Sequence, residues 1–193
     1  MGVNLVVAVT DGDWYSYLSN RPDLPEVNFW APGGNVAFRA LQQGELFLFK
    51  LHAPRNFIVG YGVFAYANTL PCSLAWAGFG EKNGAASFQE MRQRIVRYRK
   101  LKGDTREDFV IGCRLLSQPV FFDEDHWIKV PDSWSRNIVS FKKYNTDESD
   151  GRHLWEAIQN LSVDTSVEAT DLGEEQDRYG TPTLIRPRLG QGA

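Results

Sequence analysis

Two apolar segments joined by a short polar junction constrain the fold of this chain more than any other feature. Residues 46–51 and 57–67 are of strand length and rich in apolar side chains, a pattern that indicates buried β-strands. Gly60 and Gly62 lie inside the second segment, and glycine inside a strand marks a bend or a close approach of another backbone or a ligand. The two segments therefore predict adjacent strands of a curved sheet.

The junction between these strands is polar and basic. Lys50, His52 and Arg55 stand at the strand ends, and Asn56 follows them. Cationic side chains in such a position suit phosphate groups. A basic rim on a glycine-rich β-core predicts a pocket that receives a flat, anionic ligand, and a nucleotide fits this description.

The rest of the pattern predicts a mixed α+β domain. Ser87 and Glu90 form a capping box that opens a helix over residues 87–102, with Gly103 after its last turn. Residues 69–86, which include Trp76, are expected to be irregular. Further strands are expected at residues 3–9, 27–30, 109–122 and 127–130, and further helices at 14–18 and 151–161. The most economical arrangement is a curved sheet or small β-barrel with peripheral helices.

Charge is distributed unevenly along the chain. Residues 145–177 hold ten acids and a single base, Arg152, which leaves 20 bases against 14 acids in the other 160 residues. A basic body permits a nucleic-acid partner despite the net charge of −3, and an ordinary solvated surface explains it equally well. The composition predicts a domain over residues 1–161, followed by an acidic linker and a basic tail over residues 162–193.

Motifs for common catalytic chemistry are missing from the sequence. Three histidines and two distant cysteines, Cys72 and Cys113, give no zinc-ligand spacing, and no phosphate-cradling loop is present. The acidic cluster at residues 123–126 is explained better by an exposed turn than by a divalent ion. We therefore expect no cofactor and no catalytic residue in this chain. The low cysteine count and the lack of a signal peptide or membrane span predict a reduced, cytoplasmic protein.

Tryptophans near turns supply candidates for stacking a base. Trp14, Trp30, Trp76 and Trp134 all lie in or beside predicted turns. Asn28 stands near Trp30, and the pair Arg136 and Asn137 follows Trp134, so a stacking face and a hydrogen-bonding group come together. For each of these tryptophans, a hydrophobic lid on the core is an equally good explanation.

The predicted helix over residues 87–102 is strongly basic. Arg94 and Arg97 belong to a set of cations that surrounds its apolar stripe. These side chains could follow a nucleic-acid backbone, or they could form a solvated helix face.

Several segments resemble the N-terminal region of bacterial HNH endonucleases, which join a reader domain to a C-terminal nuclease. The resemblance is carried by residues 5–14, 27–30, 44–52, 58–60 and 179–192. In such proteins the nuclease follows the Arg-Leu-Gly-Gln-Gly run, so this chain looks like the reader alone. The resemblance places a divalent metal only in the absent HNH module.

The reader also resembles the PUA-like superfamily, which includes the SRA, EVE, YTH and ASCH domains. An early tryptophan, a Gly-acid strand at Gly44 and an Ile-x-Gly strand at Ile58 form the shared outline. Trp30 and the strand end from Phe49 to His52 match it best, and residues 134–137 match it by position. The resemblance implies an aromatic pocket for a modified or flipped base.

Together these observations predict a bacterial reader of modified duplex DNA, which captures a base such as a 5-substituted cytosine and directs an HNH nuclease. The full-length enzyme is compatible with a homodimer. Two alternatives remain open at this stage: a reader of backbone modification such as phosphorothioate, and a protein-interaction module that uses the acidic residues 145–177.

Overall fold

The computed structural model describes residues 1–34, 37–100 and 107–176, with side chains in the last helix as far as residue 162. The described residues form one seven-stranded sheet with the order β2-β5-β4-β3-β1-β7, and β6 pairs with β4 outside this path. The strands are β1 (Asn4–Thr10), β2 (Glu26–Ala31), β3 (Leu46–Leu51), β4 (Phe57–Pro71), β5 (Val110–Phe121), β6 (Ile128–Lys129) and β7 (Phe141–Asn145).

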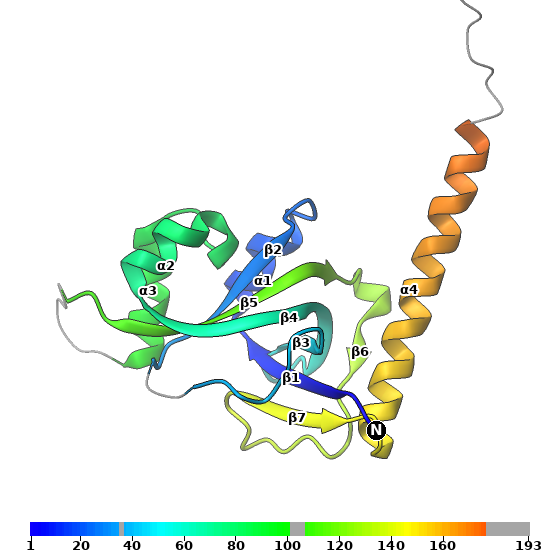
Figure 1. Cartoon of the computed structure of the whole chain (residues 1–193), viewed down its shortest axis with the longest axis horizontal. Coiled ribbons are helices and arrows are strands. Elements are labelled where there is room, and N and C mark those ends of the chain that lie inside the picture. The colour runs from blue at the N-terminus through cyan, green and yellow to red at the C-terminus, as the bar shows by residue number, and fades with distance from the viewer. Residues whose placement is uncertain (35–36, 101–106, 177–193) are drawn as a thin grey trace, which may run out of the picture. The chain divides into compact units, whose positions relative to one another are not determined.

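The sheet is curved, and the long strand β4 follows its bend (Figure 1). β1 pairs with β3 in parallel, and the other pairs are antiparallel. Register shifts in the β4–β5 pairing lie between Tyr61 and Val63 and between Phe64 and Tyr66. Bulges of this kind bend a strand and increase its twist. The α+β fold with a curved sheet, expected from the sequence, is confirmed.

The two glycines of β4 allow close approach of a neighbouring strand. A Cβ atom on Gly60 would lie 2.3 Å from the carbonyl oxygen of Val120, and one on Gly62 would lie 2.8 Å from Cβ of Leu116. Both neighbours belong to β5, so the predicted close approach is made by this strand. Larger residues at either position would push β5 away from β4.

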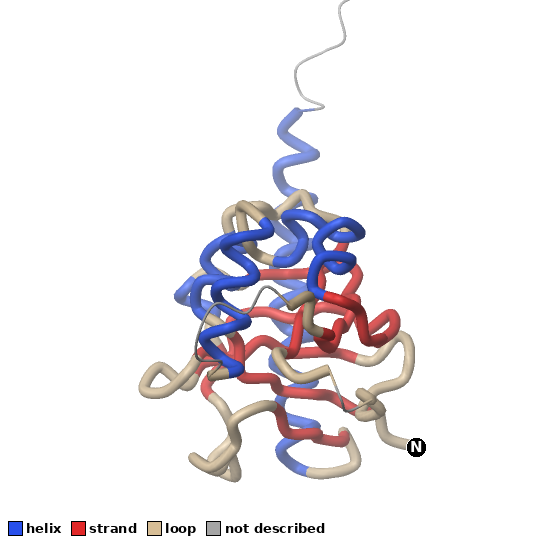
Figure 2. The backbone as a smooth tube through the Cα atoms, turned by 90° about the vertical axis from the view of Figure 1, so that its left-hand side faces the viewer, coloured by secondary structure: helices blue, strands red, loops and turns tan. Residues whose placement is uncertain are grey.

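Three short helices lie together beside the strands (Figure 2). They are α1 (Gly12–Ser19), α2 (Cys72–Phe79) and α3 (Phe88–Arg99), and the 3-10 helix η1 (Gly80–Asn83) joins α2 to the segment before α3. Asp11 caps α1, since its side chain accepts a hydrogen bond from the amide of Trp14. Ser87 caps α3 by accepting from the amide of Glu90, so the predicted start of this helix is confirmed.

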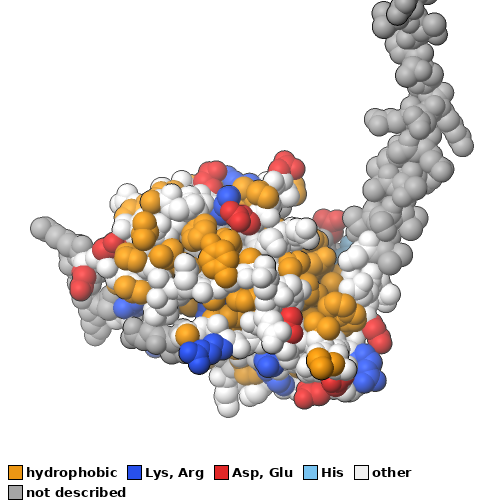
Figure 3. Space-filling model, viewed as in Figure 1, with side chains coloured by type: hydrophobic (Ala, Val, Ile, Leu, Met, Phe, Trp, Pro, Cys, Tyr) orange, Lys and Arg blue, Asp and Glu red, His pale blue; other side chains and the backbone are white. Residues whose placement is uncertain are grey.

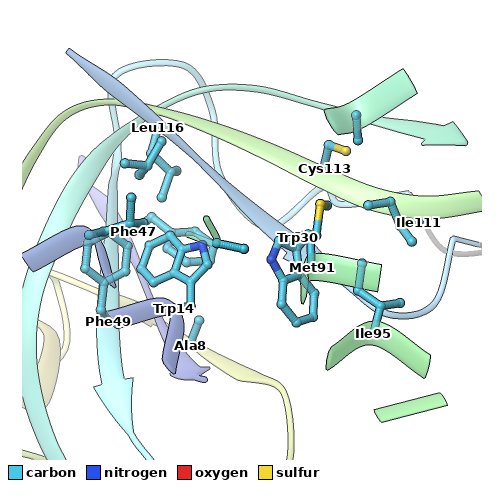
Figure 4. Packing of buried hydrophobic residues seen from close by; sticks show 14 of the residues in the cluster. Ala8, Trp14, Trp30, Phe47, Phe49, Met91, Ile95, Ile111, Cys113 and Leu116 are labelled. Carbon is cyan, nitrogen blue, oxygen red and sulfur yellow. The ribbon is translucent and has the colours of Figure 1, made fainter. Parts of the chain in front are cut away.

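Large aromatic and aliphatic side chains fill the space between the sheet and the helices (Figure 4). Trp14 packs edge-on against Phe29 and Phe49, with ring centres 5.3 and 5.1 Å apart. Every residue of β3 is buried. This explains why the sequence of β3 does not alternate and is apolar at every position except Lys50.

Residues 69–86 are more regular than the sequence suggested. β4 extends to Pro71, and α2 and η1 follow it directly. The sequence of α2 has no polar stripe to reveal its period, and neither α2 nor η1 has a side-chain cap. Tertiary contacts determine this segment, above all those of the fully buried Asn83. The expectation of irregular structure here was wrong.

α3 ends at Arg99, and the next residue, Lys100, takes a left-handed conformation with φ of 53°. The predicted C-terminal Gly103 lies outside the described residues.

The acidic cluster at residues 123–126 forms a turn that contains the 3-10 helix η2 (Glu124–His126). Among the described residues, no group of three potential metal ligands comes together.

The last helix, α4 (Ser149–Gln176), is longer than predicted and includes residues 162–176, which were expected to form a linker. The chain divides into two compact units, Met1–Trp155 and Glu156–Ala193. The basic tail predicted over residues 178–193 lies outside the described residues. Of the helices that the structure describes, none combines the length and the apolar character needed to cross a bilayer.

Candidate nucleic-acid interface

A groove of about 930 Å³ lies between the β3–β4 turn and the segment that connects β6 to β7. We call it the Lys50 groove. Its cationic side chains are those of Lys50, Arg55, Lys129 and Arg136, and its one carboxylate is that of Asp132. The full lining is Val9, Lys50, His52, Ala53, Pro54, Arg55, Asn56, Phe57, Lys129, Val130, Pro131, Asp132, Trp134, Arg136, Ile138 and Val139.

Lys50 reaches this groove because β3 is irregular at its end. The register between β3 and β4 shifts between Phe49 and Lys50, and a bulge of this kind re-aims the side chain that follows it. The Lys50 ammonium group donates hydrogen bonds to the carbonyl oxygen of Leu51 and to Oδ1 of Asn56, each at 2.9 Å. Burial lowers the pKa of Lys50 below its ordinary value.

Two tryptophans lie against the cations of the groove and of the neighbouring turn. The Trp134 ring is half-buried, and its centre lies 4.9 Å from Nζ of Lys50. The guanidinium carbon of Arg55 lies 5.3 Å from the centre of the Trp127 ring. Cation–π contacts of this kind hold a charged group in place without neutralising it. Arg55 is exposed and can contact a ligand directly. Lys50 is only 2% exposed, so the prediction that it contacts a phosphate directly was wrong, and its charge acts from beneath the groove surface.

A second, smaller cavity of about 170 Å³ adjoins the groove, since Val9, His52 and Val139 line both. We call it the Trp30 pocket. Its walls are mainly aromatic, and its polar side chains are those of Asp11, His52, Arg114 and Ser140. Val139 is 85% exposed, and His52 and Ser140 are exposed too, so these residues form the mouth. The aromatic wall residues are Trp14, Phe29, Trp30, Phe47, Tyr98 and Phe141.

Trp30 is anchored in the pocket wall by its polar edge. Nε1 donates to the backbone oxygen of Asn83 at 3.0 Å, and Figure 4 shows Met91 and Ile95 on the α3 side of its indole. The Tyr98 ring lies 6.1 Å from the Trp30 ring, and its hydroxyl donates to Oδ1 of Asp11 at 2.8 Å. Burial and this carboxylate raise the pKa of Tyr98 above its ordinary value.

Two residues that were predicted to contact the base, Asn28 and Phe49, are buried in the core and present no surface to a ligand. The amide nitrogen of Asn28 donates to Oδ1 of Asn83 at 2.9 Å inside the core, where Asn28 is fully buried. Phe49 is also fully buried, between the rings of Trp14 and Phe121. The prediction that Asn28 and Phe49 face a ligand was therefore wrong.

Trp14 has a supporting position. It is 2% exposed, and Nε1 donates to the backbone oxygen of Asn28 at 3.1 Å. Its ring is packed among core aromatics, so it backs the Trp30 pocket and offers no free stacking face. The expectation of an accessible Trp14 at a turn was wrong for this reason.

The two arginines predicted on the basic helix have different environments. Arg94 is 7% exposed; Nη1 donates to the Gly84 carbonyl at 2.7 Å, and Nη2 is paired with Glu90. The carboxylates of Asp11 and Asp13 lie 3.9 and 4.0 Å from Arg94. Arg94 therefore stabilises the fold, and the prediction that it contacts nucleic acid was wrong. Arg97 is exposed, and its contact with DNA stays a prediction.

The structure brings together Lys50, His52, Arg55, Trp134 and Arg136 in the Lys50 groove, and His52 and Trp30 in the Trp30 pocket. Asn137 is exposed but does not line either cavity. Lys129, Tyr98 and Arg114 were not predicted. For Arg114 a signal was present, because it is the one charged residue within the apolar strand β5.

The surface shown in Figure 3 has a different character. Hydrophobic side chains lie across its centre, and acidic and basic side chains lie mostly toward its rim. Exposed apolar residues of the described surface include Tyr66 on β4 and Leu74 on α2. Neither belongs to the groove or the pocket.

The fold is shared with solved structures of ASCH proteins, which are PUA-like. A tyrosine-to-phenylalanine mutant of ASCH from Zymomonas mobilis superposes with a TM-score of 0.51 at 9% identity, over 79% of this chain and 96% of that chain. A serine-to-alanine mutant of the same protein gives 0.50 at 7% identity, over 80% of this chain and 95% of that chain. No family model and no curated protein matches the sequence.

These likenesses establish a PUA-like fold for this chain, as the sequence resemblance implied. At such identities they are informative about the fold alone. The HNH endonuclease context that the sequence suggested has no counterpart in these neighbours and stays a prediction.

Proposed function

We propose that this domain binds nucleic acid, holds one nucleobase in the Trp30 pocket and neutralises the neighbouring phosphates in the Lys50 groove. In its more specific form, the ligand is duplex DNA in which a modified base, such as a 5-substituted cytosine, turns out of the helix. The observation that carries the proposal is the adjacency of the two cavities, which share Val9, His52 and Val139.

The size of the Trp30 pocket supports a ligand with a single ring. Its volume is about 170 Å³, and an apolar cavity of roughly 150 Å³ takes up benzene. Phe29 and Phe141, which are half-buried, and Trp30, which is 7% exposed, supply apolar walls. Aromatic faces of this kind contribute about 1–3 kcal/mol per stacked base, which offsets the few kcal/mol that turning a base out of a duplex costs.

The charges of the Lys50 groove support a phosphate partner. Four cationic side chains face one carboxylate there, and that carboxylate, Asp132, lies 3.9 Å from Lys129 at a fully exposed position. An exposed ion pair is weak and easily exchanged for a phosphate contact. The groove therefore presents a surplus of positive charge beside the mouth of the pocket.

Salt dependence of binding tests the proposal most directly. Each phosphate contact contributes a slope of about −0.9 to the plot of log K against log salt on duplex DNA. We expect the three exposed groove cations, Arg55, Lys129 and Arg136, to give a slope of roughly −2 to −3, and Lys129→Met and Arg136→Met each to reduce it by about one unit. Arg39→Met, at an exposed site outside both cavities, is the matched control. A protein without affinity for DNA or RNA at low salt would contradict the proposal and favour a protein-interaction module.

The more specific form requires a panel of duplexes and single strands. Methylated, hydroxymethylated and glucosylated cytosine, plain cytosine and a phosphorothioate backbone are compared at one salt concentration. Tighter binding to a 5-substituted cytosine supports base reading and the targeting of a linked HNH nuclease. Preference for phosphorothioate would instead favour backbone reading. Equal binding to all DNA duplexes, or preference for RNA, would leave nucleic-acid binding in place and remove the modified-DNA form.

A further inference from the structure

Arg114 is a charged residue of the Trp30 pocket with an unsatisfied buried donor. It lies on β5, opposite Phe29 of β2 in the sheet register, and its side chain lines the pocket. Its Nε is buried and forms no hydrogen bond. The guanidinium carbon lies 4.8 Å from the centre of the Phe38 ring, a contact that holds the group without satisfying its donors.

The one carboxylate that lines the Trp30 pocket, that of Asp11, already interacts with other groups of the protein. Oδ1 of Asp11 accepts from the Tyr98 hydroxyl, and Oδ2 accepts from the Trp14 amide and lies 3.9 Å from Arg94. Among the described residues, Arg114 forms no ion pair with it or with any other acid within 4.0 Å. Arg114 is half-buried, and its buried Nε has no acceptor. A buried donor without an acceptor is costly in a protein, and a ligand that supplies the acceptor would remove this cost.

Arg114 remains a donor under physiological conditions. Burial lowers its pKa to about 10, which still leaves the guanidinium protonated at neutral pH. A guanidinium has five donors in a flat fork and no acceptor. A ligand that satisfies it must therefore present two acceptors side by side in one plane.

On the basis of the proposed function, we infer that Arg114 selects the base by its edge and that the ligand of the Trp30 pocket is a cytosine ring. Cytosine presents two adjacent acceptors, O2 and N3, on its Watson–Crick edge. Thymine places an N3–H donor between its two carbonyls, which faces a fork made only of donors. A substituent at carbon 5 lies on the opposite edge, so 5-methylcytosine keeps the acceptor pair.

Three bases of the same shape, which differ in the groups on their Watson–Crick edge, test whether Arg114 recognises this edge. The probe is a duplex that carries 5-methylcytosine, thymine or the apolar thymine isostere difluorotoluene opposite an abasic site. No base pair has to be broken in any of them, so differences in affinity report the pocket. For the intact chain we expect 5-methylcytosine to bind about fivefold or more tighter than difluorotoluene, with thymine between them, since a bidentate arginine contact discriminates by about this amount or more.

Arg114→Met removes the donors and retains most of the volume. We expect it to bind the three duplexes within about threefold of one another, whereas Arg39→Met keeps the full preference. Arg114→Lys supplies a single point donor and should keep part of the preference. If Arg114→Met fails to fold, Arg114→Lys replaces it in the test. A full preference for 5-methylcytosine in Arg114→Lys would then overturn the inference.

The inference and the proposed function fail in different ways. If the intact chain binds all three duplexes equally, with a steep salt dependence, or if Arg114→Met keeps the preference, the role of Arg114 is overturned and binding in the groove stands. If no duplex binds at low salt, the proposed function fails and the inference falls with it.

Discussion

The ammonium group of Lys50 lies 4.9 Å from the centre of the Trp134 ring, although Lys50 is the penultimate residue of a core strand and Trp134 belongs to the connection between β6 and β7. This contact joins the two sides of the Lys50 groove. The lysine is further held by Leu51 and Asn56. The groove therefore has a charged floor whose position depends on both the β3 bulge and the later segment.

Replacing Trp134 tests the groove as a binding surface. Trp134→Ala removes the aromatic neighbour of Lys50, and we expect a loss of nucleic-acid affinity of about tenfold, given about 1–2 kcal/mol for a partly desolvated cation–π or stacking contact. Fluorescence anisotropy with a labelled duplex measures it. Trp76→Ala, on α2 and outside both cavities, should leave the affinity of the folded protein unchanged. Equal effects of the two substitutions would count against the groove.

Arg94 and Arg97 differ in burial, and their substitutions should differ in effect. Arg94→Met leaves the Gly84 carbonyl and the Glu90 carboxylate without their partner, so we expect the free energy of unfolding to fall by about 2–3 kcal/mol. Arg97→Met, at an exposed site, should change it by less than about 0.5 kcal/mol. Urea unfolding measures both. A loss of DNA affinity without destabilisation in Arg94→Met would contradict its assignment to the fold.

Two glycines of neighbouring helical segments offer a matched pair. Gly84 has φ of +76°, and a Cβ atom there would lie 2.3 Å from Cδ1 of Trp14. Gly84→Ala should therefore destabilise the protein by about 2–4 kcal/mol through strain and overpacking. Gly78 lies inside α2 with no atom within 4 Å of such a Cβ, so Gly78→Ala should stabilise it by about 0.5–1 kcal/mol. Thermal unfolding of both variants checks the opposite signs.

The buried thiol of Cys72 predicts a loss of stability at alkaline pH. Burial and, to a smaller extent, Asp108 raise the pKa of Cys72 from 9.0 to about 11. Above pH 9 the unfolded chain releases this proton while the folded chain keeps it, so stability present below pH 9 is lost as the pH rises towards 11. The full loss from this group is on the order of 3 kcal/mol.

Cys72→Ala isolates this effect from that of other buried groups whose pKa is also raised by burial, which include Cys113, Tyr15, Tyr98 and Tyr144. Urea unfolding at about pH 8 and about pH 11 should show a smaller decrease in the variant than in the unaltered protein. An identical decrease in both proteins would indicate that the thiol keeps an ordinary pKa in the folded state.

Much of the sheet could be predicted from local sequence. The apolar runs of β3 and β4, the cap at Ser87 and the close approach at Gly60 each have a local cause, and all agree with the structure. The helix α2 could not be recognised, because its sequence has neither a polar stripe nor a capping side chain. Its position depends on contacts with η1 and β4, which the local sequence does not reveal.

The candidate site was predictable in part. The basic junction at Lys50, His52 and Arg55 does line a groove, and Trp134 and Arg136 from a distant segment line the same groove. Burial was the source of the errors, because Asn28 and Arg94 have polar side chains that suggest exposure. Both have partners inside the fold, Asn83 in one case and Gly84 and Glu90 in the other.

For this protein, the sequence alone determined most of the strands, the basic character of the body and the α+β class, because these follow from local composition and period. The edge strand β7, which pairs with β1, was not predicted. Only the tertiary structure decided which polar side chains keep a hydrogen-bond donor without an acceptor. Asn28 and Arg94 found partners elsewhere in the chain, whereas Nε of Arg114 on β5 found none and its side chain lines a pocket. Hydrogen-bond partners separated widely in sequence are brought together only by folding, and so the accessible part of the site could not be read from the chain.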